Sequence, residues 1–238
     1  MQCAILAGGL GTRIRKRSNG LPKAMIPVLG KPFVFYQLEW LKRQQVQRVV
    51  LSVGHRADLI SAAVGDGSKF GLSVAYVDEG PDLRGTGGAL RLIVDRGMLD
   101  PGFLVLYGDS YLPIDIAPIW QVSEGGKVPT MTIIKNENRW DKSNVVVRDG
   151  ELILYDKEAQ DPTALGMNYI DYGLSVLTCE VIVGGITAGA VADLSQLLNK
   201  LSLERHLRAC EVFERFYEIG SPQGLSEFES FITTLQPN

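Results

Sequence analysis

The sequence has few histidines and cysteines, and this scarcity argues against several kinds of site. Only His55 and His206 are present, and Cys3, Cys179 and Cys210 lie far apart with no Cys-x-x-Cys pair. We therefore expect no zinc centre, which needs a cluster of such ligands. The odd number and wide spacing of the cysteines favour a reducing, cytoplasmic location over a disulfide framework.

Long apolar runs and an excess of basic residues are also missing. No run approaches the ~20 residues that cross a bilayer, and 24 basic residues against 27 acidic ones give a net charge of −3. We therefore expect no membrane partner and no broad basic surface for nucleic acid. A homo-oligomer is compatible with all of these features.

The first half of the chain alternates short apolar strands with amphipathic helices. This alternation predicts βαβ units, and so an α/β fold with a Rossmann-like, mainly parallel mixed sheet flanked by helices. The strands are predicted at residues 2–6, 48–53, 72–77 and 103–107, and the helices at residues 32–44, 57–64 and 89–95. The loops at residues 7–13, 82–88 and 108–110 all follow strands, so we expect them to gather at one edge of the sheet, where ligands bind.

The second half looks like a mixed extension of the same sheet. Asp149-Gly150 predicts a hairpin between two of its strands. The strands are predicted at residues 130–134, 144–147, 151–155, 169–177 and 213–219, and the helices at residues 193–201 and 222–231. Since no Pro/Ser-rich linker divides the chain, we expect a single domain over residues 1–238, with a nucleotide-binding half at 1–128 and a substrate-binding half at 129–238.

A glycine-rich segment follows the first strand, and it matches neither of two well-known phosphate loops. Ile14 stands where the dinucleotide fingerprint has glycine, and no acidic residue closes the second strand. A Walker A loop is excluded because Pro32 follows Gly30-Lys31, and Met25 stands where that loop begins with glycine. The glycines and the cations after them fit a polyphosphate site and, equally, a plain strand-to-helix turn.

A longer pattern, made of several short segments, is more specific than the glycine-rich segment alone. It comprises Leu6-Ala7-Gly8-Gly9-Leu10-Gly11-Thr12-Arg13, Leu21-Pro22-Lys23-Ala24-Met25-Ile26-Pro27-Val28, Gly30-Lys31-Pro32, Gly85-Thr86-Gly87-Gly88-Ala89, Gly108-Asp109, Tyr155-Asp156-Lys157 and Glu218-Ile219-Gly220-Ser221-Pro222. This pattern covers nearly the whole chain and resembles the sugar-1-phosphate nucleotidyltransferases, or sugar-nucleotide pyrophosphorylases. Within that family the chain is most similar to the short guanylyltransferases for heptose-1-phosphate or mannose-1-phosphate.

The resemblance implies that a nucleotidyl group is transferred from a nucleoside triphosphate to a sugar-1-phosphate, with release of pyrophosphate. GTP is the leading candidate for the triphosphate. The attacking phosphate oxygen is already anionic, so positioning and electrostatics carry the rate and no general base is needed. Two alternatives stay open: uridylyl or cytidylyl transfer to another sugar or amino-alcohol phosphate, and a catalytically silent relative that binds nucleotide-sugars and regulates a partner.

The resemblance also implies the catalytic residues. Arg13 would hold the β- and γ-phosphates, and Lys23 would bridge the α-phosphate and the attacking phosphate. Asp109 would hold Mg²⁺, which prefers oxygen ligands and few protein contacts. Glu218 stands where the family has its second metal-binding carboxylate, usually Asp, and this departure leaves two roles open, a metal ligand or a structural residue.

The remaining implied residues contact the two substrates. On the nucleotide side they are Leu6, Ala7, Gly8, Gly9, Gly11, Thr12, Gly85, Thr86, Gly87 and Gly88. On the sugar-phosphate side they are Asn144, Asp156, Lys157, Asp171, Tyr172 and Gly173. Asp156 replaces the usual Glu, and Asp171, in an apolar strand, has either sugar hydroxyls or buried N–H groups as partners.

Overall fold

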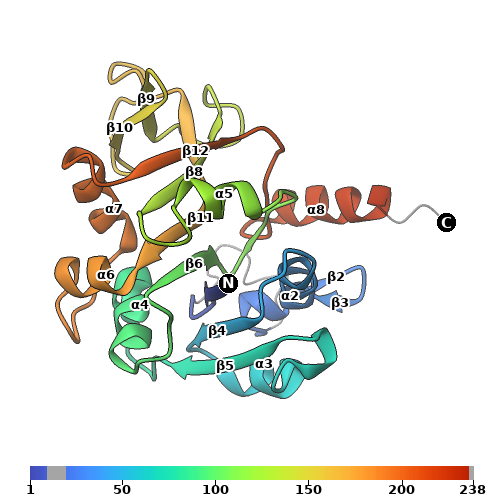
Figure 1. Cartoon of the computed structure of the whole chain (residues 1–238). Coiled ribbons are helices and arrows are strands. Elements are labelled where there is room, and N and C mark those ends of the chain that lie inside the picture. Colours follow the sequence, from blue (N-terminus) through green and yellow to red (C-terminus); the bar gives the residue numbers. More distant parts are fainter. Residues whose placement is uncertain (10–19, 236–238) are drawn as a thin grey trace. The chain divides into compact units, whose positions relative to one another are not determined.

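The computed structural model describes residues 1–9 and 20–235 (Figure 1). The chain forms two compact units, and each is built from separate stretches of sequence. The first unit comprises residues 1–83, 106–113 and 216–238, and the second comprises residues 84–105 and 114–215. Of the described helices, none is long and apolar enough to cross a membrane.

The first unit contains three neighbouring parallel strands, as the alternating pattern predicts. β4 (Arg48–Val53) lies between β1 (Gln2–Leu6) and β5 (Ser73–Asp78), and it pairs with both in parallel. Val50 is opposite Ala4 on one side and Ala75 on the other. β1 and β4 are buried along almost their whole length, as parallel strands covered on both faces are.

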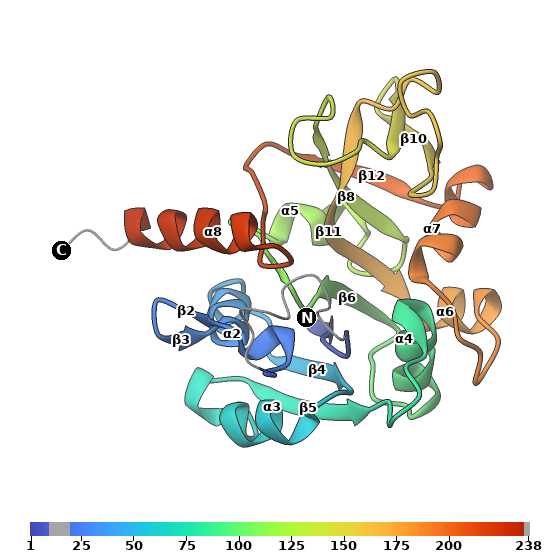
Figure 2. The ribbon, with the colours of Figure 1, turned by 180° about the vertical axis from the view of Figure 1, so that it is seen from behind.

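Two helices of the first unit share an aromatic core. α2 (Phe33–Arg43) and α8 (Pro222–Leu235) lie side by side in both views (Figures 1 and 2). Phe228 of α8 is fully buried, and its ring meets that of Phe33 edge-on with the ring centroids 5.3 Å apart. The predicted helices at 32–44 and 222–231 are therefore confirmed, and α8 continues four residues further than expected, to Leu235.

The first unit also contains short elements that complete the loops around this sheet. They are η2 (Lys23–Met25), β2 (Pro27–Val28), β3 (Lys31–Pro32), α3 (Ala57–Val64), η3 (Ser68–Phe70), β7 (Ser110–Tyr111) and β13 (Tyr217–Glu218). β7 and β13 pair in antiparallel fashion.

The second unit contains a mixed set of strands. β11 (Tyr169–Thr178) pairs antiparallel with β8 (Thr130–Lys135) and β9 (Val145–Arg148), and β12 (Arg208–Val212) pairs parallel with β8. β9 and β10 (Glu151–Tyr155) form the predicted hairpin. Its turn residues, Asp149 and Gly150, have φ of 52° and 79°, as a type I′ turn requires.

The second unit also carries four helices around its strands. They are α4 (Gly85–Asp95), α5 (Ala117–Val122), α6 (Cys179–Gly185) and α7 (Leu194–Leu203). β6 (Gly102–Tyr107) carries the chain from this unit into the first.

Two predictions of element boundaries were wrong. The helix expected at 89–95 begins at Gly85, so four residues assigned to a loop form its first turn. The strand expected at 213–219 is a loop followed by the two-residue β13, and the longer strand lies just before it at 208–212. Phe213, the first residue of the expected strand, is 79% exposed.

Candidate functional site

In the first unit, the ends of β1, β4 and β6 come together at small residues. The N–H of Gly108 donates to the carbonyl of Leu6 (3.0 Å), and the N–H of Ala7 donates to the carbonyl of Ser52 (2.9 Å). A Cβ on Gly108 would lie 2.7 Å from the Leu6 carbonyl oxygen, so only glycine allows this approach. Within this unit the loops after β1 and β6 therefore meet, as expected.

Lys23 and Asp109 form the charged centre of this region. The Lys23 ammonium donates to the Asp109 carboxylate, and the two side chains are 16% and 25% exposed. A Cβ on Gly220 would lie 3.0 Å from Lys23 Nζ and 3.6 Å from Asp109 Oδ2. The structure thus brings together two of the predicted catalytic residues. Gly220 lies next to both, and its lack of a side chain leaves space beside them.

Glu218 lies on the strand beside Asp109. It is opposite Ser110 in the β7–β13 pair, and the N–H of Ile219 donates to the Asp109 carbonyl (3.0 Å). One carboxylate from a turn and one from the strand beside it suit an ion such as Mg²⁺, which takes one or two protein carboxylates and completes its shell with water and phosphate oxygens. Over the described part of the chain, no group of three or more His, Cys, Asp or Glu side chains could hold a metal by itself.

A buried acid that the sequence analysis did not single out lies under the glycine loop. Glu79 directly follows β5, is 8% exposed, and accepts a hydrogen bond from the Ser52 hydroxyl (3.0 Å). A Cβ on Gly8 would lie 2.2 Å from its Oε1 atom. Its signal in the sequence is an acidic residue at the carboxyl end of a predicted strand, where ligands of α/β sheets bind.

The glycines of the first loop differ in their surroundings. Gly8 is closely covered by Glu79, whereas a Cβ on Gly9 would have no heavy atom within 4 Å. Gly8 therefore has a structural reason to be glycine, and Gly9 has none in the described structure. Gly11, Thr12 and Arg13, also predicted as site residues, lie outside the described residues.

In the second unit, the glycines at the start of α4 pack against a backbone segment. The N–H groups of Gly87 and Gly88 both point at the Ala192 carbonyl, at 2.8 and 3.2 Å. A Cβ on Gly85 would lie 2.5 Å from the same oxygen, and one on Gly88 would lie 2.5 Å from the Ala190 carbonyl oxygen. These glycines thus have a packing role in addition to the nucleotide contacts predicted for them.

Asp193 connects this turn to a predicted sugar-phosphate residue, and the sequence analysis missed it. It caps α7 by accepting from the Ser195 N–H (2.9 Å), accepts from the Thr86 hydroxyl (3.2 Å), and lies 3.9 Å from Lys157 Nζ. Partial burial acts to raise its pKa, but the hydrogen bonds from Ser195 and the Lys157 charge outweigh burial and lower it. Its signal in the sequence is an aspartate at the first residue of a predicted helix, where capping side chains are common.

The other predicted sugar-phosphate residues lie together in the second unit. The Asn144 side-chain oxygen accepts from the Asp171 N–H (2.9 Å), and the Asn144 carbonyl accepts from the Asp156 N–H (2.9 Å). The Asp156 carboxylate accepts from the N–H of Glu158 (2.9 Å), and Tyr172 is buried. Asn144, just before β9, thus links Asp156, just after β10, to Asp171 in β11.

Gly173 gives Asp171 an unusual setting for a strand residue. Its φ is +99°, its N–H donates to Asp171 Oδ1 (2.9 Å), and the pairing of β11 with β8 shifts register between Asp171 and Ser175. Burial raises the pKa of Asp171 to about 6, against the lowering effects of the Gly173 hydrogen bond and the Lys157 charge. Among the described groups, Asp171 thus has a backbone N–H as its partner.

Comparison with known proteins identifies the family. The model of the family described as "Nucleotidyl transferase" matches residues 3–156. This chain belongs to the nucleotidyl transferase family. Over 228 residues it is 27% identical to the D-glycero-alpha-D-manno-heptose 1-phosphate guanylyltransferase of Campylobacter jejuni, and the match covers 96% of this chain and 98% of that protein.

Other relatives of this nucleotidyl transferase are longer. It is 39% identical over 113 residues to the glucose-1-phosphate thymidylyltransferase of Streptomyces griseus, which covers 47% of this chain and 31% of the relative. It is 31% identical over 195 residues to the UTP–glucose-1-phosphate uridylyltransferase of Synechocystis, with 76% of this chain and 50% of the relative covered. The chain thus spans half or less of these two relatives.

Solved structures show the same fold for this nucleotidyl transferase. A Bacillus anthracis protein assigned as a glucose-1-phosphate thymidylyltransferase gives a TM-score of 0.85 at 19% identity, with 100% of this chain and 97% of that chain covered. HddC from Yersinia pseudotuberculosis gives 0.75 at 24% identity, with 97% and 99% covered. The predicted fold class, a mainly parallel mixed sheet flanked by helices, is confirmed.

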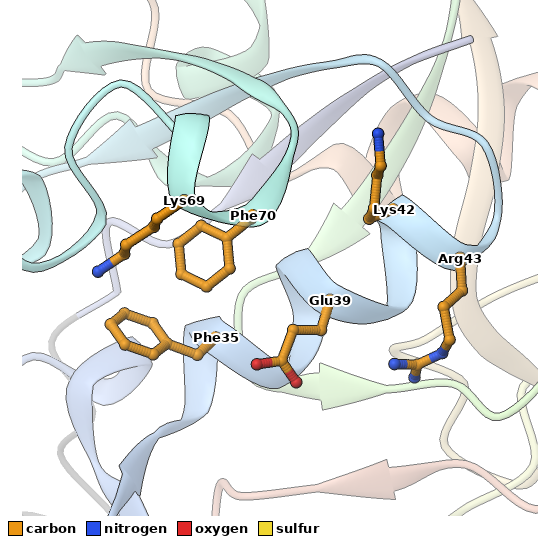
Figure 3. A pocket seen from close by; sticks show the side chains of 6 residues that line it. All are labelled: Phe35, Glu39, Lys42, Arg43, Lys69 and Phe70. Atoms are coloured by element: carbon orange, nitrogen blue, oxygen red, sulfur yellow. The ribbon is translucent and has the colours of Figure 1, made fainter.

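A hollow of about 400 Å³ in the first unit of the nucleotidyl transferase contains none of the predicted site residues (Figure 3). It is lined by Phe35, Glu39, Lys42, Arg43, Lys69 and Phe70. Its charged groups already have protein partners: Lys42 donates to the Gly71 carbonyl (2.7 Å), Arg43 to the Tyr111 hydroxyl (3.2 Å), and Glu39 accepts from Lys31 (2.8 Å). These partners indicate a structural role for its charges.

Proposed function

We propose that this chain transfers a nucleotidyl group from a nucleoside triphosphate to a sugar-1-phosphate, releasing pyrophosphate. The observation that carries the proposal is the Lys23–Asp109 pair beside the glycine turn that follows β1. A cation, a carboxylate and exposed backbone at the carboxyl ends of parallel strands are the groups that hold and activate a polyphosphate. The family match and the full-length Campylobacter relative support the same reaction.

The proposed chemistry depends on the placement of charge. Lys23 would lie against the α-phosphate and the attacking sugar phosphate, and would reduce the repulsion between these two anions. Arg13 would hold the departing β- and γ-phosphates. Asp109 and Glu218 would hold the divalent metal that enzymes of this family use, and we propose Mg²⁺, which supplies positive charge to the phosphate oxygens when bound.

The second unit would supply the sugar-phosphate contacts. Lys157 carries the positive charge for the phosphate, while Asn144 and Asp171 carry polar groups for sugar hydroxyls. Thr86 and the glycines beside it would face the nucleotide, and Asp193 joins Thr86 to Lys157. We propose a cytoplasmic location, which triphosphate substrates and the free cysteines of the described structure support.

We propose guanine as the base, and a heptose or mannose type as the sugar. One relative, which matches over 96% of this chain and 98% of its own length, is a heptose 1-phosphate guanylyltransferase. Glu79 supports the same choice, because a carboxylate only accepts hydrogen bonds. Guanine offers two donors side by side, N1–H and the N2 amino group, and no other common base does.

Uridylyl transfer is the second candidate. It is favoured by the Synechocystis uridylyltransferase, which is 31% identical over 76% of this chain. Uracil offers a single ring donor, N3–H, to a carboxylate.

A pyrophosphate-release assay tests the reaction and the base together. GTP, UTP, CTP and ATP would each be supplied with heptose-, mannose- and glucose-1-phosphate and Mg²⁺. We expect release with GTP and a heptose or mannose substrate. Release with UTP alone would replace guanine by uracil, and failure of every pair, with intact nucleotide-sugar binding, would favour the silent regulatory relative.

Glu79→Gln tests the assignment of the base. Replacing one acceptor oxygen by an amino group sets donor against donor, so we expect kcat/KM for GTP to fall about 100-fold. The ratio of kcat/KM for GTP to that for UTP is the measurement. An equal fall for all four triphosphates would show that Glu79 only supports the loop.

A further inference from the structure

One buried amide on α2 is attached to both sides of the Asp109 turn. Gln37 Nε2 donates to the carbonyl of Tyr107 (2.9 Å) and to the carbonyl of Ser110 (2.8 Å). These two carbonyls flank the Gly108-Asp109 dipeptide, one at the end of β6 and one at the start of β7. The amide therefore spans the turn that carries the Asp109 carboxylate.

The position of Gln37 in the helix makes this amide unexpected. Gln37 is fully buried, and it lies one turn from Phe33 and Val34 and one turn from Trp40 and Leu41, all of which are buried and apolar. The helical period therefore predicts an apolar side chain at this position. Among the described residues, no donor reaches its Oε1 atom, so the amide retains a buried acceptor without a partner.

A buried polar group in such a position costs stability, and an apolar side chain of the same size would pack without that cost. The two hydrogen bonds that the Gln37 amide donates to the turn offset this cost. The turn is also held by two backbone hydrogen bonds, Gly108 N–H to the Leu6 carbonyl and Ile219 N–H to the Asp109 carbonyl, and Lys23 donates to the Asp109 carboxylate. Gln37 is thus the one side chain among the described residues seen to donate to carbonyls on both sides of Asp109.

We propose that Gln37 is a positioning residue for the metal-binding carboxylate of Asp109. By fixing the carbonyls before and after the turn, it sets the direction in which the carboxylate leaves the backbone toward Lys23 and the strand of Glu218. This inference rests on the proposed function, because it takes Asp109 as a metal ligand. Groups that orient metal ligands in this way typically change metal affinity or activity by 10- to 100-fold when removed.

Gln37→Met tests the inference, because methionine has a similar length and no donor. Thr132→Val is the matched control: it removes a buried hydrogen bond from a side chain to a backbone carbonyl, that of Leu174 (2.6 Å), in the second unit. Mn²⁺, used as the probe in place of Mg²⁺, would be titrated by electron paramagnetic resonance in the presence of GTP. Melting temperatures and the kcat and KM values for GTP would be measured alongside.

We expect Gln37→Met to weaken Mn²⁺ binding and to lower kcat by about 10- to 100-fold, with a smaller change in KM for GTP. Thr132→Val should alter the melting temperature without changing Mn²⁺ affinity. Equal Mn²⁺ affinity in Gln37→Met and the wild type would overturn the inference. If Gln37→Met does not fold, Gln37→Leu supplies the same test.

Asp109→Asn separates this inference from the proposed function. If Asp109→Asn loses Mn²⁺ binding and Gln37→Met retains it, only the role of Gln37 is wrong. If Asp109→Asn binds Mn²⁺ as the wild type does, the metal site itself is misassigned, and the inference about Gln37 is overturned with it.

Discussion

Lys23 is paired with Asp109 in a partly exposed setting, where an ion pair contributes little to folding. It donates to the carboxylate that we propose as a metal ligand. Lys23→Ala should therefore lower kcat about 100- to 1,000-fold and the free energy of unfolding by no more than about 1 kcal/mol. Steady-state kinetics and urea unfolding check the two effects.

Lys31→Ala is the control for this prediction. Lys31 belongs to the same unit and pairs with Glu39 at 2.8 Å, so its loss removes a comparable ion pair away from the Asp109 turn. Its kcat should match the wild type. Equal turnover in Lys23→Ala and the wild type would refute the role of Lys23.

Asp171 makes the stability of the protein depend on pH. Its pKa is about 6 in the folded protein, while an unfolded aspartate titrates near 3.9. Between these values the folded state binds more protons, so the free energy of unfolding falls as pH rises from about 4 to about 6. Above pH 6 the full penalty for the buried charge is present.

Asp171→Asn removes this titration and keeps an oxygen for the Gly173 N–H. Relative to the wild type, the variant should gain on the order of 2 kcal/mol between pH 4 and pH 8. Urea unfolding at several pH values measures the difference. Parallel pH profiles for the two proteins would show that burial does not perturb this carboxyl.

At the level of elements, the loop after β1 and the start of α4 contain glycines for different reasons. A Cβ on Gly88 would meet the Ala190 carbonyl at 2.5 Å, whereas a Cβ on Gly9 would meet nothing within 4 Å. Gly88→Ala should lower the free energy of unfolding by about 1–3 kcal/mol. Gly9→Ala should leave it within about 0.5 kcal/mol and raise the KM for the triphosphate, because the backbone can no longer approach the phosphates.

Thermal unfolding and steady-state kinetics on the two variants provide the test. The prediction for Gly9 is wrong if its KM is unchanged, since the loop would then not approach the nucleotide. The prediction for Gly88 is wrong if its melting temperature equals that of the wild type.

The elements that the sequence predicted well are those whose partners are local or periodic. β1, β4 and β10 have the predicted limits, because continuous apolar runs bounded by turn residues define them. The start of α4 was misplaced because its glycines are typical of a loop, and the partners of its first turn, such as the Ala192 carbonyl, are distant in the sequence. Gln37, Glu79 and Asp193 escaped notice for the same reason: their significance comes from partners far away in the sequence.

At the level of the whole molecule, α8 completes the core of the first unit. Phe228 is fully buried among the rings of Phe33, Tyr36 and Tyr111, with centroid distances of 5.3, 5.5 and 4.9 Å. Phe228→Ala should lower the free energy of unfolding by about 3–5 kcal/mol. Phe213→Ala is the control, because that ring is 79% exposed, and its effect should be within about 0.5 kcal/mol.

Urea unfolding of both variants measures these two changes in the free energy of unfolding. If Phe228→Ala unfolds at the same urea concentration as the wild type, the aromatic core between α2 and α8 is not required for stability.

The chain passes between its two units four times, and the last passage brings residues 216–238 back to the unit that contains the amino terminus. A ribosome therefore releases the second unit complete before the first unit has β13 and α8. Glu218 joins Asp109 only after every residue of the second unit has been made, so a shorter nascent chain lacks one of the two proposed metal ligands. A stop codon between those of residues 215 and 218 would remove Glu218 and leave every residue of the second unit in place.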